Sequence, residues 1–280
     1  MDKEIINLFI KNAIAEDLGD GDHTTLSTIP VQEQGKAKLL IKEDGVLAGI
    51  ELAKQIFNHI DPLLKIAVFL NDGVIVKNGD IAFTVEGSVH SILLAERLVL
   101  NCMQRMSGIA TTTNRIVTLL APYKTQVLDT RKTTPGLRYL EKWAVKIGGG
   151  VNHRIGLYDM ILIKDNHVDY ASGIANAINA ANEYLQKTGK KLEIEVEVRN
   201  LEELNQVLET GKINRIMLDN FNFDDLKTAV KVIDQRYATE ASGGIVEENV
   251  TQYAACGVDY ISMGALTHSV KSLDLSLKAY

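Results

Sequence analysis

The fold is decided by the stretch from 192 to 244, which reads LEIEVEVRNLEELNQVLETGKINRIMLDNFNFDDLKTAVKVIDQRYATEASGG. Short apolar runs at 192–198, 213–218 and 238–241 alternate here with amphipathic segments at 201–210 and 224–235. The apolar residues of those longer segments recur at helical spacing. Strands that alternate with helices in this way predict a parallel sheet, because each helix carries the chain back to the start of the next strand.

The same rhythm continues on both sides of this stretch. Further strands are predicted at 126–128, 159–163 and 260–263, and further helices at 171–187 and 246–256. Six strand units over about 160 residues favour closure into a barrel over an open sheet. In such barrels the active site lies at the carboxyl ends of the strands, and the polar clusters of this sequence fall at those ends.

The N-terminal part of the chain follows another pattern. A helix is predicted at 4–16, and short extended runs between 35 and 87 are separated by glycine-containing turns. A long helical segment follows from 92 to 120, with a break expected near Ser107 and Gly108. We therefore expect an α+β module at 1–107, serving as a scaffold or dimer surface, and a barrel domain at 108–268.

Basic side chains gather between 131 and 164. They stand after two predicted strands and along the helix between them: Arg131, Lys132, Arg138, Lys142, Lys146, Arg154 and Lys164, together with His153. Arginine suits bidentate recognition of carboxylates, and lysine serves as a compact charge for phosphates. In a protein of net negative charge this cluster predicts an anion site. A solvated basic patch is the simpler alternative, but Arg131, Lys132 and Lys164 are expected at strand ends.

Acidic side chains mark the next two strands. Glu193, Glu195 and Glu197 alternate along one strand and so share a face, and Asp219 ends the following strand. Carboxylates that point into a barrel are costly unless they are paired with cations or a metal ion. Two compatible interpretations follow, an ion-pair layer with the lysines and a Mg²⁺ site shared with a phosphorylated substrate. A glycosidase-type carboxylate pair is disfavoured, because the neighbouring basic groups imply a polyanionic ligand.

Glycines follow the last two predicted strands. Ser242, Gly243 and Gly244 come after one strand, and Gly264 comes after the other. Glycine lets backbone N–H groups approach phosphate oxygens, and barrel enzymes often bind a phosphate after their last two strands. Together with the basic and acidic clusters, these turns predict a ligand with a terminal phosphate, a metal-chelating polyanion and a carboxylated partner.

Composition narrows the class of protein. The chain of 280 residues has 30 lysines and arginines and 36 acidic residues, a formal net charge of −6, which disfavours nucleic-acid binding. No apolar run approaches the roughly 20 residues that a transmembrane helix needs. The first ten residues resemble neither a signal peptide nor a transit peptide, so a cytoplasmic protein is expected. Cys102 and Cys256 are expected to be buried reduced thiols.

Several motifs resemble one enzyme family. They are EDLGDGDHTT (16–25), LAERLVLNCMQRMSGIAT (94–111), LDTRKTTPGLRYLEKWAVKIGGGVNHRIGLYDMILIKDNH (128–167), EIEVEV (193–198), IMLDN (216–220), EASGG (240–244) and GVDYISMGALTHS (257–269). Across nearly the whole chain, the sequence is similar to quinolinate phosphoribosyltransferases. The resemblance implies an N-terminal α/β sandwich and an open seven-stranded β/α barrel, with a C-terminal segment of about 269–280 that packs on the first domain.

The resemblance also implies an activity, a cofactor and a partner. The activity is decarboxylating transfer of 5-phosphoribose from phosphoribosyl pyrophosphate to quinolinate, which gives nicotinate mononucleotide, pyrophosphate and CO₂ in the synthesis of NAD. The implied cofactor is Mg²⁺. The implied partner is a second copy of the chain, in a homodimer or a higher oligomer with shared active sites.

Residue roles follow from the same resemblance. Quinolinate would be bound by Thr130, Arg131, His153, Arg154 and Lys164, with Arg97 reaching in from the partner subunit. Phosphoribosyl pyrophosphate would be bound by Lys132, Glu197, Asp219, Ser242, Gly243, Gly264 and His268. Glu197 and Asp219 would hold the metal ion, and Lys132, Lys164, Glu197 and Asp219 would carry the catalysis. Two alternatives remain open: a phosphoribosyltransferase of the same fold that acts on another pyridine or azole acid, and a catalytically silent protein that binds sugar phosphates.

Overall fold

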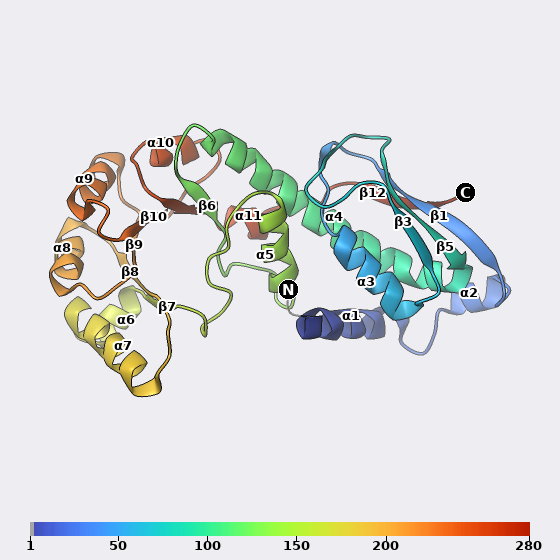
Figure 1. Cartoon of the computed structure of the whole chain (residues 1–280), viewed down its shortest axis with the longest axis horizontal. Helices are drawn as coiled ribbons and strands as arrows, with labels where there is room; N and C mark the ends of the chain where they lie inside the picture. Colours follow the sequence, from blue (N-terminus) through green and yellow to red (C-terminus); the bar gives the residue numbers. More distant parts are fainter. Residues whose placement is uncertain (1–2) are drawn as a thin grey trace. The chain divides into compact units, whose positions relative to one another are not determined.

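The computed structural model describes residues 3–280 and divides into two compact units (Figure 1). The first unit contains the chain up to residue 114 together with residues 134–149 and 269–280. The second contains residues 115–133 and 150–268. No helix among residues 3–280 is long and apolar enough to cross a membrane.

The first unit is built on a four-stranded antiparallel sheet in the order β12-β1-β5-β3. These strands span Leu275–Ala279, Gln34–Ile41, Ile81–Ser88 and Lys65–Val68. One face is apolar and buried, and it carries Ala37, Leu39, Ile41, Phe83, Val85 and Leu277. The other face carries lysine, threonine and glutamate. This alternation is typical of an antiparallel sheet with one covered face. A two-stranded ribbon, β2 (Gly45–Val46) with β4 (Ile75–Val76), adds to the unit.

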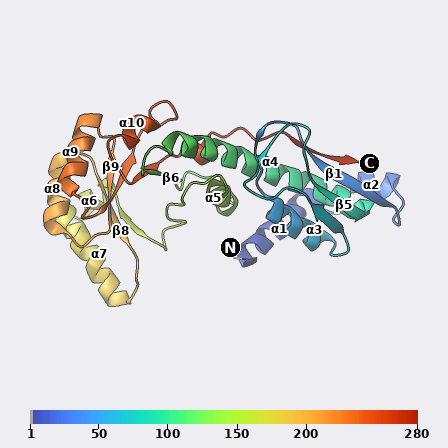
Figure 2. The same ribbon diagram turned by 45° about the horizontal axis from the view of Figure 1, so that its top comes forward.

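Helices complete the first unit. They are α1 (Lys3–Leu18), α2 (His23–Thr28), α3 (Ile50–Ile60), α5 (Arg138–Ile147) and the part of α4 (Val89–Leu120) up to residue 114. Helix α3 packs on the antiparallel sheet (Figure 2). Its Phe57 ring meets the ring of Phe83 edge-on, with 5.8 Å between the ring centroids. The C-terminal strand β12 returns to pair with β1. The unit is therefore an α/β sandwich, as the sequence predicted.

The break expected near Ser107 is wrong, because α4 runs without interruption from Val89 to Leu120. The glycine that suggested the break has another purpose. A Cβ atom at Gly108 would collide with the backbone carbonyl of Lys271, so Gly108 allows the C-terminal chain to lie against the helix. The boundary predicted between residues 107 and 108 accordingly falls inside a continuous helix.

The second unit is a parallel sheet curved into a ring, in the order β6-β11-β10-β9-β8-β7. In chain order the strands are β6 (Gln126–Leu128), β7 (Ile161–Ile163), β8 (Ile194–Val198), β9 (Arg215–Asp219), β10 (Ala238–Ser242) and β11 (Tyr260–Ser262). The connecting helices lie outside the ring (Figure 1): α6 (Asp165–Tyr170), α7 (Ile174–Thr188), α8 (Leu201–Thr210), α9 (Phe223–Ile233) and α10 (Val250–Ala254), with α11 (Ala265–His268) after the last strand. The β/α barrel predicted from the strand–helix rhythm is confirmed.

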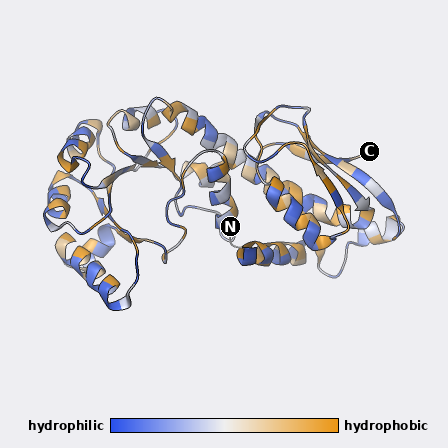
Figure 3. Ribbon diagram, viewed as in Figure 1, coloured by the Kyte–Doolittle hydropathy of each residue, from blue (hydrophilic) through white to orange (hydrophobic). Residues whose placement is uncertain are grey.

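Hydropathy explains why the helices stand outside the strands. Helices α7, α8 and α9 each have a hydrophobic side and a hydrophilic side (Figure 3). Each helix buries the hydrophobic side on the sheet and exposes the other. Asn200 and Asn222 begin α8 and α9 and accept hydrogen bonds from the first-turn N–H groups with their side chains. The helices therefore begin directly after strands β8 and β9.

The barrel has six strands and a single bridge residue in place of the expected seventh strand. Val151 pairs with Leu128 as an isolated bridge next to β6. Within the described part of the chain, no ladder joins Val151 to β7, so the ring is open at that point. The expectation of a seventh full strand is corrected, because residues 152–160 make no strand ladder.

Candidate active site

A cavity of about 830 Å³ opens at the carboxyl ends of the barrel strands. On four strands its lining residues stand two positions apart, since alternate side chains of a strand share one face. These pairs are Leu162 and Lys164, Met217 and Asp219, Glu240 and Ser242, and Ser262 and Gly264; Glu197 lines the cavity from β8. The intervening residues, such as Val196, Leu218 and Ala241, are buried on the outer side. The polar residues predicted at separate strand ends thus meet in one cavity.

Four basic side chains line this cavity: Arg131, Lys132, Arg154 and Lys164. Burial, followed by the nearby positive charge of Arg131, lowers the pKa of Arg154. Two guanidinium groups brought together in this way repel each other unless an anion lies between them. The buried Nε atom of Arg154 also has no hydrogen-bond partner. The site is therefore arranged for an anionic ligand.

The loop after β6 is held in place by two threonines. The backbone N–H of Lys132 donates to the hydroxyl of Thr130 at 3.0 Å. The hydroxyl of Thr267 donates to the carbonyl of Lys132 at 2.8 Å. These contacts fix the backbone of Lys132 while its side chain stays exposed at the cavity.

Carboxylates line the opposite part of the cavity. Lys164 Nζ donates to Glu197 Oε2 at 2.6 Å, which is the lysine–carboxylate pair that the sequence predicted. Asp219 follows on the next strand and accepts from the side chain of Asn220 at 2.6 Å. Each carboxylate retains a second oxygen, and oxygen donors of this type suit a hard cation such as Mg²⁺. Glu193, which was expected on the same face as Glu197, is exposed before β8 begins.

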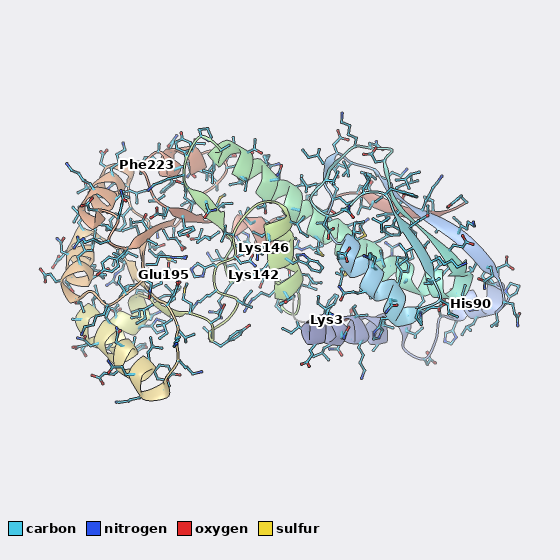
Figure 4. All side chains as sticks on the ribbon, in the orientation of Figure 1. Lys3, His90, Lys142, Lys146, Glu195 and Phe223 are labelled. Carbon is cyan, nitrogen blue, oxygen red and sulfur yellow. The ribbon has the colours of Figure 1, made fainter. Side chains whose placement is uncertain are left out.

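A buried charged layer lies below these groups. His153 Nε2 is 2.9 Å from Glu195 Oε2 and 3.5 Å from Glu240 Oε2, and Arg215 donates to Glu240 at 3.1 Å. Glu195 lies on β8 in the ring of strands (Figure 4). Burial raises the pKa of Glu195, and burial with repulsion from Glu195 raises that of Glu240 to about 7. Burial therefore favours the protonated forms of these carboxyl groups, and the barrel interior at this depth is a layer of ionisable, hydrogen-bonded side chains.

The ligand atoms of His153, Glu195 and Glu240 lie within 4.8 Å of one another, close enough to hold a metal ion. The histidine ring argues against one. Its Nδ1 atom accepts the N–H of Arg154 at 2.8 Å, so a neutral ring carries its proton on Nε2. That proton points at Glu195 and leaves no lone pair for a metal. We therefore interpret this cluster as a hydrogen-bonded layer.

Glycines shape the far end of the cavity. Gly243 has φ +96°, and a Cβ atom there would collide with Asn220. A Cβ atom at Gly264 would lie 3.0 Å from both His268 and Lys132. Backbone N–H groups can approach a ligand closely at such positions, which suits phosphate oxygens.

The structure brings most of the predicted site residues together. The cavity lining includes Thr130, Arg131, Lys132, His153, Arg154, Lys164, Glu197, Asp219, Ser242, Gly243, Gly264 and His268. Arg97 is not part of this lining and lies exposed on α4. Three other predicted basic residues, Arg138, Lys142 and Lys146, lie on α5 in the first unit.

The sequence did not predict four further residues that line the cavity, Leu162, Met217, Glu240 and Ser262. Each stands two positions before a predicted site residue, at 164, 219, 242 and 264. Alternation along the strands could have identified them. Asn220 was also missed, and its positive φ of 56° marks it as a constrained residue after β9.

The fold and the cavity define a β/α-barrel protein whose strand ends form a site for a polyanionic, phosphate-bearing ligand. A family model described as quinolinate phosphoribosyl transferase, C-terminal domain, matches residues 109–278. The model of the N-terminal domain of the same family matches residues 22–107. The chain therefore belongs to the quinolinate phosphoribosyl transferase family, as its motifs indicated.

Curated relatives and solved structures agree with this assignment. The chloroplastic nicotinate-nucleotide pyrophosphorylase (carboxylating) of Arabidopsis thaliana is 48% identical over 284 residues, covering 96% of this chain and 81% of the relative. Quinolinate phosphoribosyltransferase (decarboxylating) 1b of Nicotiana tabacum shows the same identity and coverage. The nicotinate-nucleotide pyrophosphorylase structure from Francisella tularensis has a TM-score of 0.93 at 40% identity, covering 100% of this chain and 98% of that one.

Proposed function

We propose that the protein transfers 5-phosphoribose from phosphoribosyl pyrophosphate to quinolinate with loss of CO₂, giving nicotinate mononucleotide and pyrophosphate for NAD synthesis. The observation that carries this proposal is the meeting of Arg131 with Arg154 in the cavity that also contains Glu197, Asp219 and the glycine turns. A dicarboxylate suits the paired guanidinium groups, and a sugar phosphate suits the rest of the cavity.

Quinolinate is assigned to the basic part of the cavity. Arg131 and Arg154 would each face a carboxylate, and Lys164 would add a third positive charge at the end of β7. The family resemblance adds Thr130 and His153 to this group, and both line the cavity beside the two arginines. Support comes from burial, because Arg154 Nε has no protein partner and gains one when a carboxylate binds.

Phosphoribosyl pyrophosphate is assigned to the remainder of the cavity. Its 5′-phosphate would meet Ser242, Gly243, Gly264 and His268, where backbone can approach closely. Lys132 would bind the pyrophosphate, and Glu197 and Asp219 would bind the ribose hydroxyls. Bound Mg²⁺, held by Glu197 and Asp219, would neutralise charge on the leaving pyrophosphate.

The chemistry needs no covalent nucleophile. As the bond from ribose to pyrophosphate breaks, positive charge develops on the ribose ring, and Glu197 and Asp219 would stabilise that charge electrostatically. The pyridine nitrogen then bonds to the ribose carbon and becomes cationic. Loss of the adjacent carboxylate as CO₂ leaves its electron pair on a ring carbon beside that cationic nitrogen, and protonation of this carbon gives the product.

A direct assay tests the proposal. Purified protein is mixed with quinolinate, phosphoribosyl pyrophosphate and Mg²⁺, and nicotinate mononucleotide is measured. Parallel reactions with nicotinate and other pyridine or azole acids test the alternative substrates. Folded protein that binds phosphoribosyl pyrophosphate without turning over any acid would favour the silent sugar-phosphate-binding alternative. Omission of Mg²⁺ in the presence of a chelator should abolish product formation.

We further propose a homodimer, or a higher oligomer, in which Arg97 reaches the quinolinate site of the partner subunit. Support comes from its exposure on α4 and its absence from the cavity lining. Mixed oligomers of Arg97→Ala and Lys132→Ala chains should recover part of the activity, because one site per pair keeps both residues. No recovery in mixed oligomers verified by mass spectrometry would contradict sharing of the site.

A cytoplasmic location is the last part of the proposal. The Arabidopsis thaliana relative is chloroplastic by name, so the location needs its own measurement. Fractionation of the source cells, followed by detection of the full-length protein, should find it in the cytoplasmic fraction.

A further inference from the structure

His153 and Arg154 stand in a segment that has no strand ladder of its own. Val151 makes one bridge, and the next strand begins only at Ile161. The backbone N–H of His153 donates instead to Asp129 Oδ1 at 2.9 Å, and that of Arg154 donates to His153 Nδ1 at 2.8 Å. Buried N–H groups must be paired. Side chains therefore replace, at this opening of the barrel, the hydrogen bonds that a seventh strand would supply.

The hydrogen bonds determine the protonation of the His153 ring. Nδ1 accepts the N–H of Arg154 and so carries no proton, which leaves the proton on Nε2. Nε2 lies 2.9 Å from Glu195 Oε2, a distance that suits donation to the carboxylate. Both ring nitrogens thus face protein partners. A neutral ring in this state has no N–H left to donate to a substrate carboxylate.

The partners of the ring are themselves anchored. Glu240 Oε2 lies 3.5 Å from His153 Nε2 and accepts from Arg215 at 3.1 Å, and the Arg215 guanidinium lies over the ring of Tyr260 at 4.5 Å. Glu195 and Glu240 are fully buried. The network connects β8, β9, β10 and β11 to the segment that carries Arg154.

Arg154 depends on this network for its orientation. Its Nη1 atom donates to the carbonyl of Met160 at 3.1 Å, while Nε is buried without a partner. The loop that follows is held separately by Asp159, whose carboxylate accepts the N–H groups of Ile155 and Gly156 at 2.7 and 2.9 Å. The backbone N–H of Arg154 itself is held by its hydrogen bond to the neighbouring histidine ring. A shift in the backbone of Arg154 would therefore move its guanidinium within the cavity.

We propose that His153 is a positioning residue, a neutral imidazole held by Glu195 and Glu240 that fixes Arg154 toward the substrate carboxylate and is not itself a carboxylate ligand. The inference rests on the proposed function for the identity of that substrate. Glu195 and Glu240 are then positioning residues as well, acting on quinolinate through His153 and Arg154.

The first test measures the state of the ring. In ¹⁵N spectra of histidine-labelled protein, with the signal assigned by its loss in His153→Gln, we expect a neutral ring protonated on Nε2. The spectrum should show the same state after quinolinate is added. An imidazolium, or a proton on Nδ1, in either sample would overturn the inference. The measurement on the free protein does not depend on which acid the enzyme uses.

The second test separates hydrogen bonding from charge at Glu195. In Glu195→Gln the amide oxygen can accept from His153 while the amide nitrogen donates to Glu240, so quinolinate affinity should stay within about threefold of wild type. Glu195→Ala removes the acceptor and should weaken quinolinate binding by roughly 10- to 100-fold. Binding of phosphoribosyl pyrophosphate with Mg²⁺ should change less than about threefold in both variants. Glu193→Gln and Glu193→Ala, two residues earlier and exposed, are the matched controls.

Two results would contradict the inference: unchanged quinolinate affinity in Glu195→Ala, or an equal loss in Glu195→Gln and Glu195→Ala. If Glu195→Ala does not fold, the tautomer and the glutamine variant decide the question. Failure of the wild-type protein to make nicotinate mononucleotide would instead be a failure of the proposed function. A wrong tautomer in an active enzyme would be a failure of this inference alone.

Discussion

The two sheets of this protein bury opposite kinds of side chain. The antiparallel sheet of the first unit covers its inner face with residues such as Leu39, Phe83 and Val85. The parallel ring of the second unit buries Glu195 and Glu240 inside, although buried carboxylates are costly. The apolar face stabilises the fold by burial alone. On the proposal above, the charged interior holds the segment that carries Arg154 in place, so stability and function would be assigned to different sheets.

The largest expected change is a loss of stability after a substitution in the apolar sheet. Phe83→Ala removes a ring that packs edge-on against Phe57 and should lower the free energy of unfolding by about 3–5 kcal/mol. Denaturant unfolding followed by circular dichroism measures this. Phe69→Ala, at a side chain that is 58% exposed in the same unit, is the control and should have little effect. Equal losses in the two variants would contradict the assignment of stability to this face.

The charged layer should respond to pH where the apolar sheet does not. The pKa of Glu240 is raised to about 7, so the folded protein keeps a proton that the unfolded chain releases near its ordinary value of 4.5. Stability is therefore highest below pH 4.5 for this group and falls as pH rises to 7, by about 3 kcal/mol at most. Glu195, His153 and Arg215 face this carboxyl group.

Glu240→Gln removes the titrating carboxyl group, so the free energy of unfolding should decrease less as pH rises. Unfolding free energies of wild type and variant, measured between pH 5 and about 7.5, should diverge steadily across this window. Glu209→Gln, an exposed position on α8, should keep the wild-type dependence. A Glu240→Gln curve parallel to that of wild type would show that Glu240 does not titrate in this window.

A substitution in the basic part of the cavity should weaken the binding of one substrate only. Arg131→Ala removes a charged partner and should weaken quinolinate binding by about 1.5–3 kcal/mol, roughly 10- to 100-fold, with little change for phosphoribosyl pyrophosphate. Titration calorimetry with each ligand measures the two changes in affinity separately. Arg236→Ala, an exposed arginine before β10, serves as the control. Equal losses for both ligands would mean that the carboxylate assignment is wrong.

The smallest expected effect concerns the glycine turn after β10. Gly243→Ala places a side chain at φ +96°, and the left-handed backbone alone should cost about 1–2 kcal/mol. Binding of inorganic phosphate and of phosphoribosyl pyrophosphate should weaken by about 10-fold. Gly189→Ala, at φ +67° with open space around it, carries comparable strain outside the cavity. If Gly189→Ala weakens phosphate binding equally, the loss is due to general destabilisation.

Local patterns predicted a large part of this site. The predicted site residues at 164, 197, 219, 242 and 264 stand at strand ends, and strand–helix alternation was sufficient to place them at one end of the barrel. The seventh strand that the family resemblance implied is not formed, and Val151 makes a single bridge beside β6 instead. A strand needs a ladder of several paired residues with at least one neighbour, and whether the bridge of Val151 extends into a ladder depends on how far the ring closes. The helix break predicted near Gly108 failed for a related reason. This glycine makes room for the backbone of Lys271, which is near it in space but distant in sequence.

The sequence by itself determined the β/α rhythm and the family, because both depend on residues near one another in the chain. Tertiary structure alone decided that His153 meets Glu195 and Glu240, which lie 42 and 87 positions further along the chain. Their contact depends on the order and register of β8 and β10, and their pKa values depend on burial inside the closed part of the ring. Neither burial nor register is a local property, so the charged layer appeared only when the barrel was assembled.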